Sequence, residues 1–238
     1  MSINKENNLL NKKIVYDLTS FSHLDYPSHL SCIVWIVGCG FRCDYCYNSD
    51  IVFTKSGKYS FNDILSFLDT RINLLDAIVL SGGEATGVDL IPFCKQVKKK
   101  GFKIKLDTNG VNFEQIKKLL ELKLLDYIAL DYKAPKYKFT NITHSSLLKF
   151  DQFEQTLIYL INNNFDFEVR TTVHSDLLNE NDINFIINYL YNKEYKGIYY
   201  LQNYFDSNNT IGNISKQQYQ LNINQINTEK IKIQYRNF

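Results

Sequence analysis

The chain has 238 residues, of which 45% are hydrophobic and 22% charged, as is ordinary for a globular protein large enough to bury its own core. A net charge of +2 is too small to indicate binding to nucleic acid or to an anionic membrane, so we expect neither partner. The polar N-terminus is unlike a signal peptide, and no segment approaches the roughly 20 apolar residues that span a bilayer. We therefore expect a cytoplasmic protein.

Strand-like and helix-like segments alternate after residue 30. The first, SCIVWIVG at 31–38, is a continuous apolar run rich in β-branched residues, which is typical of a strand buried on both faces. Ser60 is the expected N-cap of the first helix, because its hydroxyl can accept from a free backbone N–H. We expect strands at 31–38, 76–81, 102–108, 125–131, 167–173 and 197–204, and helices at 60–72, 88–100, 112–123, 145–163 and 179–193.

This alternation predicts βαβ units and a parallel sheet, and so an α/β fold. The pattern leaves open a closed barrel, a partial barrel and a flat doubly wound sheet. We expect a flexible segment at 1–14, a core domain at 15–205, and a C-terminal tail at 206–238, of unassigned role, that packs on the same domain.

Unusual polar motifs stand at the ends of the expected strands, which is where barrels and open α/β sheets alike carry their function. Cysteines follow the first strand, and SGGE (81–84), DTNG (107–110) and LDYK (130–133) follow or close the next three. Chemistry is therefore expected on this side of the sheet.

Three of the five cysteines, Cys39, Cys43 and Cys46, lie within eight residues at the spacing C-x3-C-x2-C. Three thiolates fit a [4Fe–4S] cluster whose fourth iron is left open for a substrate or cofactor. The alternative is a zinc site completed by a fourth ligand, for which His23 or His29 is available. The lack of a second C-x2-C pair weakens the zinc alternative.

With Tyr45 just before the last cysteine, the motif resembles the signature of the radical S-adenosylmethionine (radical SAM) superfamily. The resemblance implies a partial (β/α)6 barrel and makes residues 15–205 its core domain. It also implies that Cys39, Cys43 and Cys46 hold one [4Fe–4S] cluster, whose remaining iron is chelated by S-adenosylmethionine. Gly82-Gly83-Glu84 could be a plain strand-to-helix turn, but here it resembles the family's GGE motif, which receives the ammonium group of that cofactor.

Two further motifs, DTNG (107–110) and LDYK (130–133), resemble elements of the glycyl-radical-enzyme activases. Each alone could be a turn or a surface ion pair. The resemblance implies that Asp107 lies on the ammonium side of the cofactor and, with Thr108, near a monovalent cation. It places Asp131 at the ribose or that cation, and Lys133 at the carboxylate, as a charge-assisted hydrogen bond requires.

Five further residues have a structural explanation at least as good as a functional one. Arg170 and Thr172 match positions where activases touch the cofactor, but Arg170 could equally form an ion pair across the sheet. His174 is expected to be structural. Cys32 and Cys94 lie in apolar strand and helix patterns and are expected in the core.

The entry segment Asp25-Tyr26-Pro27-Ser28 stands where activases commonly have Asp-Gly-Pro-Gly. This variant, together with Tyr47-Asn48 after the cysteines, is similar to the activating proteins of anaerobic ribonucleoside-triphosphate reductase. The resemblance implies an enzyme that makes a glycyl radical on that reductase, with a flavodoxin or ferredoxin-type electron donor. The alternatives are a radical enzyme acting on a small molecule, like 7-carboxy-7-deazaguanine synthase, and a zinc-stapled binding module.

Overall fold

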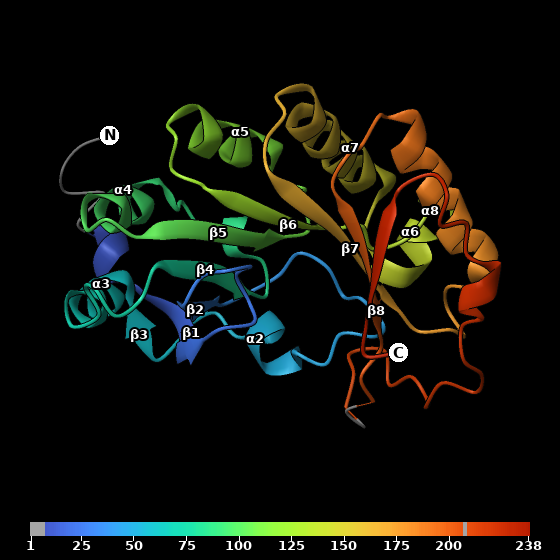
Figure 1. Ribbon diagram of the computed structural model, residues 1–238. Coiled ribbons are helices and arrows are strands. Elements are labelled where there is room, and N and C mark those ends of the chain that lie inside the picture. Colours follow the sequence, from blue (N-terminus) through green and yellow to red (C-terminus); the bar gives the residue numbers. More distant parts are fainter. Residues whose placement is uncertain (1–7, 207–208) are drawn as a thin grey trace. The chain divides into compact units, whose positions relative to one another are not determined.

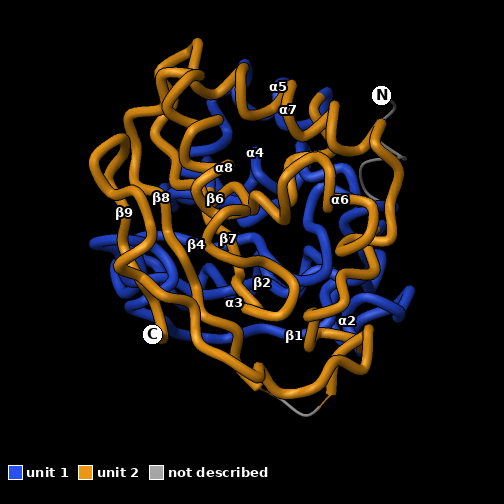
Figure 2. Tube along the Cα trace, turned by 90° about the vertical axis from the view of Figure 1, so that its right-hand side faces the viewer, with its two compact units in different colours: residues 1–40, 50–108, 114–128 blue, residues 41–49, 109–113, 129–238 orange. Residues whose placement is uncertain are grey.

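The computed structural model describes residues 8–206 and 209–238 (Figure 1). The chain divides into two compact units, coloured separately in Figure 2. Unit 1 consists of Met1–Gly40, Asp50–Thr108 and Glu114–Ile128, and unit 2 of Phe41–Ser49, Asn109–Phe113 and Ala129–Phe238. Residues 1–7 of the expected flexible segment lie outside the described residues; in the remainder, residues 8–11 are helical and a strand begins at Lys13.

Unit 1 is built on strands in the order β3-β1-β2-β4-β5. They are β1 (Lys13–Ser22), β2 (Ser31–Ile36), β3 (Tyr59–Ser60), β4 (Ala77–Gly82) and β5 (Lys103–Thr108). Neighbours β2, β4 and β5 run parallel, whereas β1 is antiparallel to both β2 and β3. The apolar runs of β2 and β4 are almost wholly buried, as expected for strands covered on both faces.

Short helices follow the strands of unit 1: α2 (Ser49–Phe53), α3 (Phe61–Asp69), η1 (Ala85–Gly87), α4 (Ile91–Lys99) and α5 (Phe113–Glu121). Helix α3 starts at Ser60 with a capping box, in which the Ser60 hydroxyl accepts from the backbone N–H of Asp63 and the Asp63 carboxylate accepts from the backbone of Ser60. Its apolar face packs on α4 through Phe61 and Phe93, whose ring centroids are 4.2 Å apart.

Unit 2 continues from β6 (Tyr127–Asp131), which passes from unit 1 into unit 2 at residue 129. Its strand order is β6-β7-β8-β9, with β7 (Phe167–Val173), β8 (Ile198–Asn203) and β9 (Lys232–Arg236) parallel to one another. The helices are α6 (Lys136–Thr143), α7 (Leu147–Asn162), α8 (Glu180–Asn192) and η2 (Ile223–Gln225). Aromatic side chains fill the core here, and Tyr132 lies 4.8 Å from Phe153 between ring centroids.

All six expected strands are confirmed, as β2, β4, β5, β6, β7 and β8, and the five expected helices as α3, α4, α5, α7 and α8. Strands β1, β3 and β9 and helices α2 and α6 were not expected. Strand β1 lacks a continuous apolar run because it is only half buried. Among the described residues, no helix has the length and apolar character needed to cross a membrane.

The cap at Ser60 can be tested directly. Ser60→Ala should lower the free energy of unfolding by about 1 kcal/mol, because the first turn of α3 loses its side-chain acceptor. The measurement is urea unfolding followed by circular dichroism. The control is Ser66→Ala, since the Ser66 hydroxyl is exposed and only bonds the Asn62 carbonyl within the same helix. Equal losses in both variants would contradict the assigned cap.

Candidate active site

The cysteine loop begins in unit 1, where it is bonded to the GGE turn. The backbone N–H of Gly83 donates to the carbonyl of Ile36 (2.9 Å), and that of Glu84 donates to the carbonyl of Gly38 (2.7 Å), directly before Cys39. A Cβ atom at Gly83 would lie 2.2 Å from the carbonyl oxygen of Gly38, so only glycine fits there. The two motifs that the sequence singles out are therefore held backbone to backbone.

The rest of the loop belongs to unit 2, where the end of α6 holds it. Arg42 N–H donates to the carbonyl of Thr143 (2.9 Å), and Asp44 N–H to the carbonyl of Ile142 (3.1 Å). Within the loop, the N–H of Cys46 donates to the Cys43 carbonyl (3.0 Å). None of the three motif cysteines is part of a disulfide; Cys43 is buried, and Cys39 and Cys46 are partly exposed.

The other two cysteines behave differently. Both are buried, and burial raises the pKa of Cys32 to about 12 and raises that of Cys94 as well. A thiol that keeps its proton is a poor metal ligand. Their expected place in the core is confirmed.

Tyr45 lies beside the charged groups of unit 2. Its side chain is buried, and its hydroxyl has no hydrogen-bond partner among the described residues. Burial raises the pKa of Tyr45 well above its usual value, while the nearby Lys133 charge lowers it and Cys43 raises it. The phenol therefore stays neutral and keeps a hydrogen-bond donor that none of the described residues accepts.

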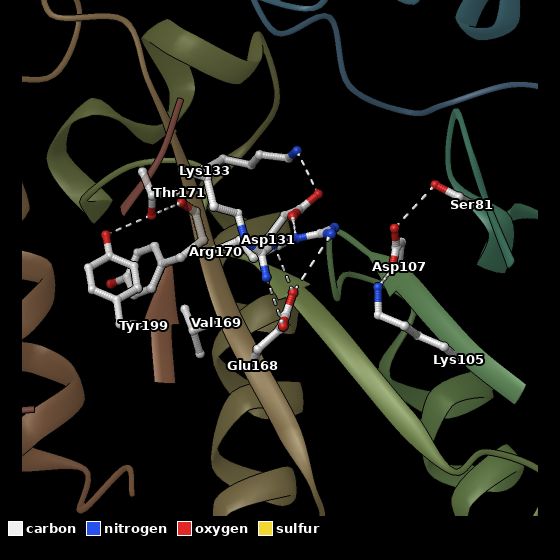
Figure 3. A network of polar contacts seen from close by, with 12 residues as sticks. Ser81, Lys105, Asp107, Asp131, Lys133, Glu168, Val169, Arg170, Thr171 and Tyr199 are labelled. Carbon is white, nitrogen blue, oxygen red and sulfur yellow. Dashed lines mark hydrogen bonds and ion pairs between the residues drawn. The ribbon is translucent and has the colours of Figure 1, made fainter. Parts of the chain in front are cut away.

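Asp131, Lys133 and Arg170 form one ion-paired group in unit 2 (Figure 3). Asp131 accepts from Lys133 Nζ at 3.0 Å and from Arg170 Nε at 2.9 Å. Burial acts to raise the pKa of Asp131, but the two cations outweigh it and leave the pKa below its usual value. Burial likewise acts to lower the pKa of Lys133, and Asp131 more than compensates. Both groups are charged at neutral pH.

The expected ion pair of Arg170 is thus present, and it extends to two residues that sequence reasoning missed. Glu168 on β7 is almost wholly buried, 4.0 Å from Arg170 Nη1 and 3.4 Å from both terminal nitrogens of Arg236 on β9. The alternation in FEVRTTV placed Glu168, Arg170 and Thr172 on one strand face and could have indicated the first of them.

In unit 1, the carboxylate of Glu84 is held by the motif's own neighbours. Its Oε1 accepts from the hydroxyls of Thr86 and Thr108, each at 2.7 Å, and from the N–H of Thr86 at 3.1 Å. Glu84 and Thr108, two candidates from different motifs, are therefore brought together. Both are buried.

Asp107 has a partner that the sequence analysis did not single out. Lys105, two residues earlier on the same face of β5, places its Nζ 2.6 Å from Asp107 Oδ1, and the Ser81 hydroxyl lies 3.5 Å from the other oxygen (Figure 3). The Lys105 side chain is only 3% exposed. Buried lysines are normally paired, so the spacing K-x-D was a usable signal.

The entry segment keeps a glycine-like shape without glycine. Ser28 has φ +61°, in the left-handed region that glycine favours. His29, considered as a zinc ligand, is engaged elsewhere: Nδ1 contacts the Pro27 carbonyl and Nε2 contacts Lys103, both at 2.7 Å. His174 is buried, with Nε2 3.0 Å from the Ser215 carbonyl.

Comparison with known proteins adds the decisive observation: residues 33–189 match the family model of the radical SAM superfamily. The chain belongs to the radical SAM superfamily. A Methanocaldococcus jannaschii protein, provisionally named as a glycyl-radical enzyme activating enzyme, is 32% identical over 181 residues, covering 72% of this chain and 73% of its own. The pyruvate formate-lyase-activating enzyme of Streptococcus mutans is 33% identical over 117 residues, covering 45% and 44%.

Solved structures of other proteins share the fold. SuiB of Streptococcus suis bound to S-adenosylmethionine matches with a TM-score of 0.66 at 12% identity, over 84% of this chain and 48% of SuiB. QueE of Escherichia coli matches with a TM-score of 0.51 at 12% identity, over 85% and 89%. The chain thus spans about half the length of SuiB. These likenesses confirm the expected α/β fold class. Membership of the family confirms the expectation of a radical SAM enzyme.

Membership of the radical SAM superfamily implies S-adenosylmethionine and a [4Fe–4S] cluster, and the residues fit both. The motif supplies three thiols outside any disulfide, and the buried Tyr45 hydroxyl has hydrogen-bonding capacity to spare. Among the described residues, no group of three or more His, Cys, Asp or Glu side chains is placed to hold a single metal ion. The donor set is thiol-rich, as iron–sulfur clusters require.

The Lys105–Asp107 pair yields a stability prediction. Lys105→Met should lower the free energy of unfolding by about 3 kcal/mol, because it leaves the Asp107 carboxylate without its cation in a mostly buried position. Urea unfolding measures the loss. Lys103→Met, on the same strand but exposed, is the matched control, and adding Asp107→Asn to Lys105→Met should recover part of the loss. A loss no larger than that of the control would refute the pairing.

Proposed function

We propose that this radical SAM enzyme holds a [4Fe–4S] cluster through Cys39, Cys43 and Cys46 and generates a glycyl radical on a partner enzyme. The observation that carries the proposal is the C-x3-C-x2-C motif, none of whose cysteines is in a disulfide, in a chain whose relatives are named activating enzymes. Residues 15–205, which contain the matched region, would form the catalytic core. Both ring nitrogens of His29 contact other groups, so His29 is not available as the fourth ligand of the alternative zinc site.

The bound cluster and S-adenosylmethionine would supply one-electron cleavage to methionine and a 5′-deoxyadenosyl radical, which takes a hydrogen atom from a glycine Cα and leaves 5′-deoxyadenosine and the glycyl radical. The chain's own residues would bind and orient the cofactor. Lys133, charged at neutral pH, would pair with its carboxylate. The carbonyls of Gly82 and Gly83, with Glu84, would receive its ammonium group.

Other residues would also contact the cofactor. Tyr45 would contact it with a ring whose hydroxyl stays protonated. Asp131 would meet the ribose while Arg170 fixes its carboxylate in place. Asp107 and Thr108 would lie on the ammonium side, near a monovalent cation. Lys105 already places one positive charge beside Asp107. If a monovalent cation binds there as well, S-adenosylmethionine should bind more tightly in potassium chloride than in choline chloride. Equal affinity in the two salts would count against that cation.

The partner we favour is anaerobic ribonucleoside-triphosphate reductase, with a flavodoxin or ferredoxin-type electron donor. Tyr47-Asn48 after the cysteines and the glycine-like turn at Ser28 support this choice. The similarity to pyruvate formate-lyase-activating enzymes makes pyruvate formate-lyase the partner to test beside it. Electron paramagnetic resonance should detect a glycyl radical on the reductase after anaerobic incubation with the reduced enzyme and S-adenosylmethionine. A radical on pyruvate formate-lyase alone would overturn the choice of partner.

The cluster assignment has its own test. After anaerobic reconstitution with iron and sulfide, the wild-type chain with dithionite should convert S-adenosylmethionine to 5′-deoxyadenosine, detected by mass spectrometry. Cys43→Ala should abolish both the cluster and the product, because a thiolate ligand is lost. Cys94→Ala is the control, since it removes a buried, protonated cysteine outside the motif and should retain both. A Cys43→Ala variant with wild-type activity would refute the ligand assignment.

A further inference from the structure

The C-terminal segment, residues 209–238, is part of unit 2 and has no role in the function proposed so far. It ends in β9, which pairs with β8 in parallel from Lys232 to Arg236. Between β8 and β9 the chain makes specific contacts at two places that matter for the proposed cofactor site. One is the cysteine loop, and the other is the ion-paired group around Asp131.

At the cysteine loop, the segment bonds the residues on either side of Tyr45. Ile211 N–H donates to the carbonyl of Cys46 (2.9 Å), and Gly212 N–H donates to the carbonyl of Asp44 (3.0 Å). A Cβ atom at Gly212 would lie 2.5 to 2.7 Å from atoms of Asp44, so this contact requires glycine. Asp44 also accepts from His144 Nε2 at 2.6 Å, next to the end of α6.

These bonds matter because residues 39–48 contain no helix or strand of their own. Backbone groups of a buried loop must find partners elsewhere in the protein. In unit 2, carbonyls of α6 accept hydrogen bonds from the N–H groups of Arg42 and Asp44. N–H groups of the C-terminal segment donate to the carbonyls of Asp44 and Cys46. The geometry of the Cys43–Cys46 turn therefore depends on both neighbours.

At the second place, charges alternate from β9 to Lys133. Arg236 approaches the buried Glu168 at 3.4 Å, and Glu168 lies 4.0 Å from Arg170. Arg170 donates to Asp131 (2.9 Å), and Asp131 accepts from Lys133 (3.0 Å). Arg236 is also held over the Tyr200 ring, 3.6 Å from its centroid. Without Arg236, Glu168 would draw more on Arg170, and the hold of Arg170 on Asp131 would weaken.

Between the two places the segment is anchored to the loop after β7. Ser175 N–H donates to Gln217 Oε1 at 2.9 Å, and its hydroxyl bonds the Tyr219 carbonyl. The ring of His174 contacts the Ser215 carbonyl at 3.0 Å. The segment is thus fastened along its length.

We propose that residues 209–238 are a positioning element of the cofactor site. Ile211 and Gly212 hold the turn that carries Cys43 and Cys46, and Arg236 acts through Glu168 and Arg170 on the Asp131–Lys133 pair. This inference rests on the proposed function, because it assigns the held residues to the cluster and to S-adenosylmethionine. It gives the C-terminal segment a role in positioning the cofactor site, in addition to its strand pairing.

The first test needs neither cluster nor cofactor. Hydrogen–deuterium exchange of the full-length, cluster-free chain should show faster exchange in the 41–47 peptide of Gly212→Ala than of wild type. The β7 peptide, 167–173, should be unchanged. Gly87→Ala is the matched control, since nothing lies within 4 Å of the added methyl group. Wild-type exchange at 41–47 in Gly212→Ala would overturn the hold on the cysteine loop.

The second test reads the charge route by binding. Isothermal titration of the reconstituted enzyme should show S-adenosylmethionine affinity about tenfold weaker in Arg236→Met, the size expected for loosening one charge-assisted contact. Arg236→Lys should recover part of the loss, and iron content should stay at wild-type level. The control is Lys232→Met, an exposed residue on the same strand. Wild-type affinity in Arg236→Met would overturn the route.

The two tests also separate this proposal from the proposed function. A wild-type chain that takes up iron but binds no S-adenosylmethionine would refute the cofactor assignment, and the charge route with it. Exchange at 41–47 would still decide whether Gly212 holds the loop.

Discussion

The cysteine loop depends on backbone partners supplied by other parts of the chain. In unit 1, the carbonyl of Gly38 is taken by Glu84; in unit 2, Asp44 bonds α6 with its N–H and the C-terminal segment with its carbonyl. Each of these approaches brings two backbones so close that one of them is glycine, Gly83 in the first case and Gly212 in the second. The demand of an irregular buried loop for hydrogen bonds thus explains sequence features far from the cysteines.

Buried charge is the second constraint, and several charged candidate residues have an oppositely charged partner at short range. Lys105 pairs with Asp107 in unit 1, and Asp131 takes both Lys133 and Arg170 in unit 2. Because the pKa of Asp131 is lowered and that of Lys133 raised, neither group changes charge near neutral pH. Within unit 2, fixed neighbouring charges of both signs suit a ligand that carries an ammonium and a carboxylate group together.

The parts of the fold that could be predicted from the sequence are those that local patterns specify. Buried parallel strands such as β2 and β4 are continuous apolar runs, and Ser60 marks a helix start by its own chemistry. Motifs within a few residues, such as the cysteines and Gly82-Gly83-Glu84, were visible for the same reason. The resemblance to a known family then joined motifs that pattern alone left separate.

The rest could not be predicted because it depends on partners distant in sequence. Strand β9 is identified by its pairing with β8. The role of Arg236 depends on its contact with Glu168, 68 residues earlier in the sequence. The sequence shows that Lys105 is charged, but its burial could not be predicted, since burial depends on what packs over β5. Ser28 shows another limit: serine stands where activases commonly have glycine, yet its backbone adopts the left-handed conformation that glycine favours.

The protonated state of Cys32 and Cys94 has a consequence for how the protein handles sulfur chemistry. Iron, alkylating reagents and disulfide exchange all act on thiolates, and burial keeps these two cysteines in the thiol form. Burial thus takes two of the five cysteines out of this chemistry. Under the proposed cluster assignment, burial in the core would keep Cys32 and Cys94 from competing with the motif for iron.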